Sequence, residues 1–192
     1  MIRIAVVGDI GSGKSYVARQ FGYPVFSADA EVGKLYKKNR KCYNKLKKAL
    51  PEYIVSFPVK KIDITKAIIA DRHNLKKIIK IVHPEVRSNM NNFIKKNKNK
   101  KLIILDIPLL MENKINKKND ILIFVDAKKK EINKRLKKKL NINLKIIEKF
   151  KKLQLPVELK KRKSDFIIKN NFKNNSIKKS VKKVVKKILL NV

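Results

Sequence analysis

The 192-residue sequence has no tryptophan, one cysteine, five glycines, and 15 acidic residues against 51 lysines and arginines. The single cysteine, Cys42, cannot form a disulfide within the chain, which fits a reducing compartment such as the cytoplasm. No apolar run approaches the roughly 18 to 20 residues that a membrane-spanning helix needs. The N-terminal residues also lack the apolar core of a signal peptide. We therefore expect a soluble, cytoplasmic, single-domain protein without a membrane partner.

The shortage of acidic residues leaves a net charge of +36, a value typical of proteins that bind nucleic acid. The distribution of the charge argues against that function. Residues 1–33 carry three basic and three acidic residues, whereas residues 128–163 carry sixteen basic and three acidic ones. No aromatic residues are interleaved with the lysines in a nucleic-acid-binding pattern. We interpret the excess as solvated surface, and a nucleic-acid-stimulated ATPase stays an alternative.

Three of the five glycines lie in residues 8–15, which read G-D-I-G-S-G-K-S. This sequence matches the phosphate loop G-x-x-x-x-G-K-[ST], and it lies between the apolar run 4–7 and a helix-forming stretch. In such a loop the backbone N–H groups surround the phosphates, Lys14 reaches the outer phosphates and the Ser15 hydroxyl is available to Mg²⁺. The sequence therefore predicts an ATP site formed by Gly11, Ser12, Gly13, Lys14, Ser15 and Tyr16.

Short β-branched runs alternate with lysine-rich segments of helical period, which predicts an α/β fold with a parallel sheet covered by helices on both faces. The predicted strands are residues 2–7, 24–27, 102–107, 121–126 and 165–168. The predicted helices are residues 14–22, 29–40, 64–70, 73–82, 85–98, 128–139, 144–163 with a break at Pro156, and 177–190.

Some seventy residues without a convincing strand separate the second predicted strand from the third, which is too long for a plain connection. We interpret this stretch as a helical insertion that binds the phosphate acceptor, and residues 128–163 as a helical lid. The apolar stripe of residues 176–192 suits a helix docked on the sheet better than one lying on a membrane.

Two acidic residues follow predicted strands at the carboxyl edge of the sheet, where open α/β folds bind ligands. Asp29 could act as a base or hold Mg²⁺, or it could cap a helix that begins at Ala30. Asp106 could orient metal-bound water, or it could form a turn before Pro108. His83, before Pro84, is interpreted as a helix start and structural turn, with a ligand contact as the alternative.

Together these segments resemble the dephospho-coenzyme A kinase family over essentially the whole chain. The loop 8–15 is similar to the family's Gly-x-Ile-Gly-Ser-Gly-Lys-Ser, and 83–87 (H-P-E-V-R) resembles its His-Pro-x-Val-Arg element. Residues 106–112 (D-I-P-L-L-M-E) resemble its most distinctive run, Asp-Ile-Pro-Leu-Leu-Phe-Glu. Residues 164–170 (S-D-F-I-I-K-N) are similar to its Ala-Asp-Phe-Val-Ile-x-Asn strand.

Three positions depart from the family pattern. Ser27 replaces the first acid of the family's Asp-Ala-Asp element, whose second acid is kept as Asp29. Lys139 replaces the second of two lid arginines, of which Arg135 is the first, and a lysine cannot grip phosphate with two prongs. Phe172 stands where the family has a glycine beside the adenine site.

The resemblance implies a three-layer phosphate-loop NTPase fold with a five-stranded parallel sheet. It divides the chain into a core (about 1–35, 100–127 and 164–192), an acceptor-binding insertion (about 36–99) and a lid (about 128–163). It implies phosphorylation of the ribose 3′-hydroxyl of dephospho-coenzyme A by ATP with Mg²⁺, and a nucleoside monophosphate kinase is the alternative of the same class. The implied catalytic residues are Asp29, Lys14 and Arg135. Asn170 would lie near the adenine, and the acceptor would contact His83, Arg87, Asp106, Pro108 and Leu109.

Overall fold

The computed structural model describes residues 1–138 and 144–190, and it divides them into two compact units. We call the first the α/β unit; its described residues are 1–27, 97–138 and 147–190. The second, the helical unit, comprises residues 28–96 together with 144–146. The division into core, acceptor-binding insertion and lid stays a prediction.

The α/β unit is built on a five-stranded, all-parallel sheet in the order β2-β3-β1-β4-β5. The strands are β1 (Ile2–Gly8), β2 (Val25–Ser27), β3 (Leu102–Asp106), β4 (Ile121–Asp126) and β5 (Phe166–Lys169). Each lies within a residue or so of a predicted strand. The continuous burial of β3, and of most of β1 and β4, explains why these strands are apolar throughout rather than alternating.

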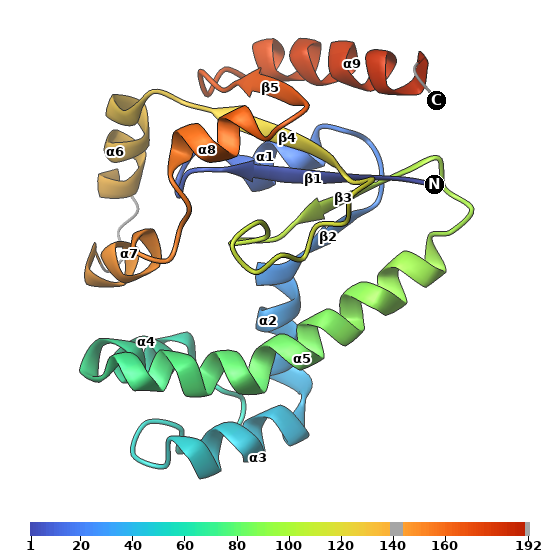
Figure 1. Cartoon of the computed structure of the whole chain (residues 1–192). Helices are drawn as coiled ribbons and strands as arrows, with labels where there is room; N and C mark the ends of the chain where they lie inside the picture. Colours follow the sequence, from blue (N-terminus) through green and yellow to red (C-terminus); the bar gives the residue numbers. More distant parts are fainter. Residues whose placement is uncertain (139–143, 191–192) are drawn as a thin grey trace. The chain divides into compact units, whose positions relative to one another are not determined.

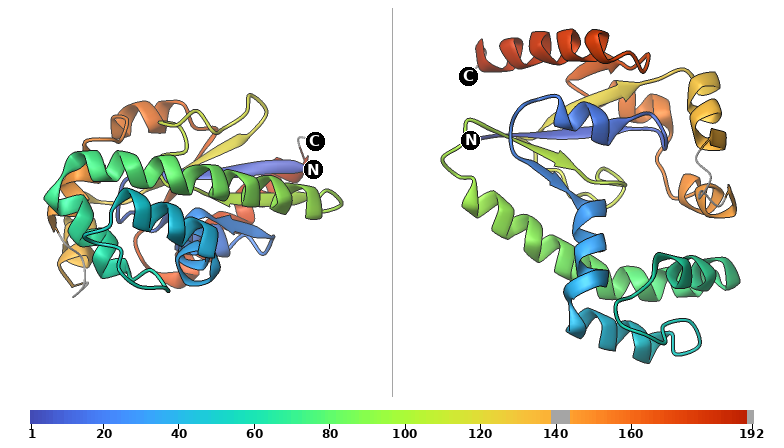
Figure 2. Two further views of the ribbon diagram at one scale, coloured as in Figure 1. Left: turned by 90° about the horizontal axis from the view of Figure 1, so that it is seen from below. Right: turned by 180° about the vertical axis from the view of Figure 1, so that it is seen from behind.

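Helices cover both faces of this sheet. On one face, α1 (Lys14–Arg19) and α9 (Asn174–Leu190) share a core cluster with alternate residues of β1, β3 and β4, such as Ile4, Ile104 and Ile123. On the other face lies α8 (Val157–Arg162), as the front and back views show (Figures 1 and 2). The C-terminal stripe of α9 is buried against the sheet, so the predicted docking is confirmed.

Two further helices lie between β4 and α8 along the chain. They are α6 (Lys129–Lys138) and α7 (Leu144–Lys151). Helix α7 ends before Pro156 and α8 begins after it, so the predicted interruption of the helix at this proline is confirmed. Side chains of both helices meet in a small apolar cluster of Ile132, Leu136 and Ile147.

The helical unit contains α2 (Ala28–Lys38), α3 (Arg40–Ala49), α4 (Lys61–Ala70) and α5 (Arg72–Lys96) around its own apolar cluster. The sequence analysis did not predict α3, whose ten residues include four lysines and an arginine. The side chain of Asn39 accepts a hydrogen bond of 2.8 Å from the Cys42 N–H, which ends α2 and begins α3.

The interpretation of His83-Pro84 as a helix start is wrong, because α5 runs unbroken through Pro84. A proline inside a helix removes one backbone hydrogen bond and costs about 3 kcal/mol or more. Here Pro84 is exposed, and the same helix buries Ile78, Val82 and Met90 on either side of it. Burial of this continuous apolar stripe offsets the cost of the lost hydrogen bond, so the helix continues through Pro84 rather than starting there.

We predict that β5 tolerates change on only one of its faces. Ile168 is 1% exposed in the core cluster, whereas its neighbour Ile167 is 46% exposed. Ile168→Ala should lower the free energy of unfolding by about 2 to 5 kcal/mol, because it leaves a cavity in a packed core. The matched variant Ile167→Ala should cost less than about 1 kcal/mol. Urea unfolding followed by circular dichroism measures both, and equal losses would contradict this account of the strand.

Candidate active site

The phosphate loop joins β1 to α1 through backbone conformations that glycine adopts most readily. Gly11 has φ of 84° and Gly13 has φ of 91°, both in the left-handed region. A side chain at Gly13 would also collide with the Asn170 amide. The Gly13 carbonyl accepts hydrogen bonds of 3.0 Å from the N–H groups of Tyr16 and Val17, which begins α1 directly behind the loop. The loop therefore has the curled shape that a phosphate-binding helix N-terminus requires.

Lys14 lies folded over the loop. Its Nζ donates to the carbonyl oxygens of Asp9 at 2.8 Å and Gly8 at 3.3 Å. The Ser12 side chain is fully buried inside the loop, and its hydroxyl has no hydrogen-bond partner among the described residues. A buried hydroxyl without a partner is rare and points to a missing one. The loop therefore carries an ammonium group folded over it and an unsatisfied hydroxyl in its interior.

Asn170, at the end of β5, is tied to the phosphate loop. Its Nδ2 donates to the Ser12 carbonyl at 2.7 Å, and its Oδ1 accepts from the Phe172 N–H at 2.8 Å. Its backbone N–H donates to the Asp126 carbonyl at the end of β4. Asn170 is 4% exposed, so this side chain holds the loop against the sheet edge from within. The structure thus brings Asn170 together with the predicted ATP residues.

Helix α6 packs directly on the loop. A Cβ added to Gly11 would lie 3.0 Å from the Ile132 side chain and 3.2 Å from that of Leu136. Between these two residues, the Arg135 guanidinium stacks on the Phe172 ring at 4.4 Å from its centroid. The Phe172 ring in turn reaches within 3.5 Å of where a Gly13 Cβ would be. Arg135 therefore lies beside the loop, whereas Lys139 falls outside the described residues.

The substitution of Phe172 for glycine has a structural consequence. Phe172 has a left-handed backbone with φ of 61°, which a glycine would adopt without strain. Its ring stacks with Arg135, and its N–H donates to Asn170. Phe172 therefore adds an aromatic surface to the turn next to the loop.

The carboxyl edge of the sheet carries the second predicted acid. Asp106 ends β3, is 4% exposed and pairs in register with Ser27, the last residue of β2. Beyond it, Pro108 is exposed and Leu109 is half-buried with φ of 55°. A leucine in this region is strained, and such strain clusters at functional sites. The structure places these predicted acceptor residues at the rim that also carries the phosphate loop.

Asp29 lies two residues beyond β2, in the first turn of α2, and its side chain is exposed. Because α2 begins at Ala28 rather than Ala30, Asp29 is inside the helix. The alternative that Asp29 is an N-cap residue is therefore wrong.

His83 and Arg87 lie four residues apart in the middle of α5, on the same face of the helix. Burial, with a smaller contribution from the Arg87 guanidinium, lowers the pKa of the His83 imidazole. His83 is therefore neutral near pH 7, and of the pair Arg87 alone offers a charge to an anionic ligand.

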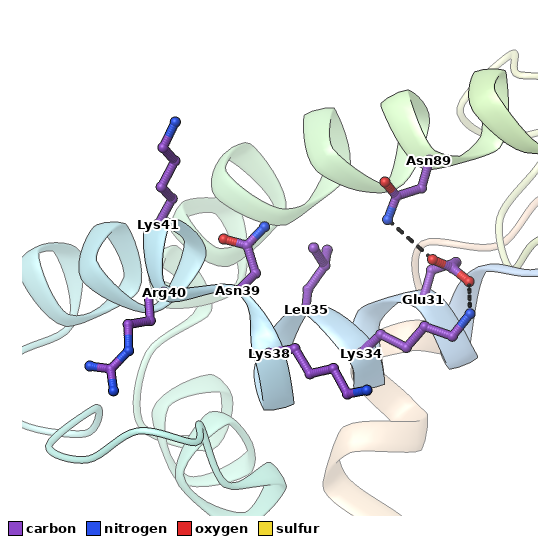
Figure 3. A pocket seen from close by; sticks show the side chains of 8 residues that line it. All are labelled: Glu31, Lys34, Leu35, Lys38, Asn39, Arg40, Lys41 and Asn89. Carbon is purple, nitrogen blue, oxygen red and sulfur yellow. Dashed lines mark hydrogen bonds and ion pairs between the residues drawn. The ribbon is translucent and has the colours of Figure 1, made fainter.

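The helical unit also has a pocket of about 460 Å³ between α2, α3 and α5 (Figure 3). At its edge the Glu31 carboxylate accepts a hydrogen bond from Asn89 at 3.1 Å and pairs with Lys34 at 2.6 Å. Lys38, Arg40 and Lys41 add positive charge to the lining. Neither His83 nor Arg87 is among the described residues that line it.

The described residues contain no group of three or more His, Cys, Asp or Glu side chains that could hold a metal ion. Within the same residues no helix is long and apolar enough to cross a membrane.

Two charged residues beside the loop, the buried Lys160 and the half-buried Glu112, were not assigned a role in the sequence analysis. Lys160 in α8 is 2% exposed, and its Nζ lies 3.3 Å from a carboxylate oxygen of Glu112. Glu112 ends the distinctive run 106–112, so the motif itself marked it. Lys160 lies beside Lys161 and Arg162, and no pattern distinguishes it from the exposed lysines of the chain.

A phosphate loop between the first strand and first helix of a parallel 2-3-1-4-5 sheet defines a phosphate-loop kinase fold. A sequence model of the dephospho-CoA kinase family matches residues 2–177. The chain belongs to the dephospho-CoA kinase family, which confirms the resemblance and makes it a kinase. Members of this family phosphorylate dephospho-CoA with ATP, the last step of coenzyme A biosynthesis.

Individual relatives agree with the family. The dephospho-CoA kinase of Wolbachia pipientis wMel is 35% identical over 170 residues, which are 86% of this chain and 87% of that protein. The dephospho-CoA kinase of Bartonella quintana is 33% identical over the same shares of the two chains.

Solved structures share the fold. A crystal structure of a protein from Thermus thermophilus superimposes with a TM-score of 0.75 at 24% identity, covering 100% of this chain and 97% of that one. Dephospho-CoA kinase from Campylobacter jejuni superimposes with a TM-score of 0.65 at 21% identity, covering 97% and 96%.

We predict that Gly13→Ala strongly weakens nucleotide binding without unfolding the protein. The added methyl group would both collide with the Asn170 amide and strain a left-handed backbone. ATP titration calorimetry should show at least about a hundredfold loss of affinity, or about 2.7 kcal/mol. The control is Gly33→Ala in α2, where a Cβ meets open space, and it should bind ATP normally and be slightly more stable. Retained ATP affinity in Gly13→Ala would show that the loop does not need this conformation.

Proposed function

We propose that this chain transfers the γ-phosphoryl group of ATP to the ribose 3′-hydroxyl of dephospho-coenzyme A, with Gly11–Ser15 holding the triphosphate. The observation that carries the proposal is the preformed phosphate loop, held by Asn170 and covered by α6, in a chain of this family. Positioning and electrostatics supply most of the catalysis in reactions of this type.

In this proposal Lys14 and Arg135 neutralise charge on the transferred phosphoryl group. The Lys14 ammonium already lies over the loop, and α6 holds Arg135 beside it. Lys14 leaves the Asp9 carbonyl and follows the outer phosphates when ATP binds. Arg135 exchanges the Phe172 ring for phosphate oxygens, a change that its planar guanidinium allows.

ATP-dependent kinases use a divalent metal ion, and we propose that it is Mg²⁺ here. The fit rests on oxygen donors: the Ser15 hydroxyl in the first turn of α1 and the Asp106 carboxylate at the sheet edge. Mg²⁺ prefers such hard ligands and is commonly held by one or two protein oxygens with the substrate phosphates. When bound, the ion would offset negative charge on the phosphate oxygens.

We propose Asp29 as the base for the acceptor hydroxyl. Its exposed carboxylate follows β2, whose last residue pairs with Asp106 at the carboxyl edge. Asp29 takes the hydroxyl proton as the new oxygen–phosphorus bond forms and the bond between the β and γ phosphates breaks, releasing ADP. On the helical unit, the charged Arg87 and the neutral His83 would contact the acceptor. Arg87 would bind the phosphate groups of the acceptor. A cytoplasmic location and the absence of a nucleic-acid partner stay predictions.

The reaction is tested by incubating the purified protein with ATP, Mg²⁺ and dephospho-coenzyme A. We expect mass spectrometry to find coenzyme A, which is heavier than the acceptor by one phosphate, with one ADP formed for each molecule. Adenosine and cytidine monophosphates in place of the acceptor should give turnover at least about a hundredfold slower, a difference of about 2.7 kcal/mol in activation free energy. Faster phosphorylation of a nucleoside monophosphate would overturn the acceptor assignment.

We predict that Asp29→Asn leaves ATP binding unchanged and lowers kcat by about a hundredfold or more, the usual contribution of a general base. The amide keeps the size of the carboxylate but cannot accept the hydroxyl proton. Asp63→Asn is a matched control, since Asp63 lies in the first turn of another helix of the same unit. Turnover of Asp29→Asn close to that of the Asp63→Asn control would exclude Asp29 as the base.

A further inference from the structure

Lys160 is a buried cation at the base of the phosphate loop. Its Nζ donates to the Gly8 carbonyl at 3.4 Å and to Glu112 Oε1 at 3.3 Å. The same Glu112 oxygen accepts the Leu155 N–H at 3.0 Å, just before α8 begins. A charge is buried at considerable cost unless it is paired and hydrogen-bonded, and here both partners are in place. Lys160 therefore connects α8 and the run 106–112 with the last residue of β1.

The Gly8 carbonyl receives a second ammonium group, that of Lys14, at 3.3 Å. Nucleotide binding requires Lys14 to move but leaves Lys160 in place. Lys14 is the phosphate-loop lysine, which reaches the β and γ phosphates of a bound triphosphate. Lys160 is held by Glu112 and by its burial, so it stays where it is.

We propose that Lys160 is a positioning residue for ATP binding: it remains bonded to the Gly8 carbonyl and thereby releases Lys14 to the triphosphate. The inference rests on the proposed nucleotide site at the loop. Lys160 acts through Gly8 and Lys14 rather than by touching the nucleotide.

Without Lys160, the Gly8 carbonyl and the phosphates would compete for the single ammonium group of Lys14. Nucleotide binding would then break a charge-assisted, partly buried hydrogen bond and leave it unreplaced. The loss of such a bond corresponds to about a tenfold weaker ATP affinity. This loss of affinity depends on Lys14 and on the outer phosphates of the nucleotide. If Lys160 only stabilised the fold, its removal would have the same effect without Lys14 or without the outer phosphates.

The experiment is a double-mutant cycle on the dissociation constant of ATP, measured by calorimetry. All variants carry Glu112→Gln, which keeps an oxygen for the Leu155 N–H but leaves no unpaired carboxylate when Lys160 is replaced. Lys160→Met and Lys14→Met are then introduced singly and together. We expect Lys160→Met to raise the dissociation constant about tenfold when Lys14 is present and less than about twofold when it is absent. An equal factor in both backgrounds would overturn the inference.

A second readout uses AMP, which lacks the outer phosphates. Lys160→Met should weaken ATP about tenfold and AMP less than about twofold, since AMP does not draw Lys14 from Gly8. Equal weakening of the two nucleotides, or no weakening of either, would exclude the positioning role. Failure of the unsubstituted protein to bind ATP, while folded, would instead overturn the nucleotide site on which the proposal rests.

Discussion

The structure around the site depends on the carbonyl oxygens of the phosphate loop. A loop that turns its N–H groups towards phosphates leaves carbonyl groups facing away, and each buried carbonyl needs a donor. Gly8 and Asp9 receive the ammonium of Lys14, Ser12 receives the amide of Asn170, and Gly13 receives N–H groups of α1. Lys160 adds a further donor to Gly8 from α8. The shape of the phosphate-binding surface is thus maintained by hydrogen bonds to the loop carbonyl groups that face away from the phosphates.

These donors come from segments far apart in the sequence. Asn170 follows β5, Lys160 lies in α8, and α6 packs on Gly11 through Ile132 and Leu136. Because parallel strands end at one edge of the sheet, the chain returns to that edge after each crossover, where it can supply another contact.

The positively charged side chains of the described residues fall into two groups. A few cations have fixed partners near the loop, and the many lysines on helix surfaces are solvated.

The strands and the loop were predictable because their signals are local. Four or more consecutive β-branched or apolar residues, as in β4, predict a strand covered on both sides. The helical unit was less predictable. Pro84 carries a local signal for a helix start, but packing of the stripe around Val82 and Met90 overrides it. In α3 an excess of lysine hid the period of Cys42 and Leu46, which only the packed cluster makes plain.

The sequence by itself determined the phosphate loop, the parallel sheet and the membership of a kinase family, since these follow from short patterns of glycine, lysine and apolar residues. The tertiary structure decided which of many similar side chains serve the loop. A lysine is marked as buried and paired only when the residues around it are known, so Lys160 was indistinguishable from Lys161 beforehand. The same holds for Phe172, whose left-handed backbone and stack with Arg135 depend on contacts that no local pattern encodes.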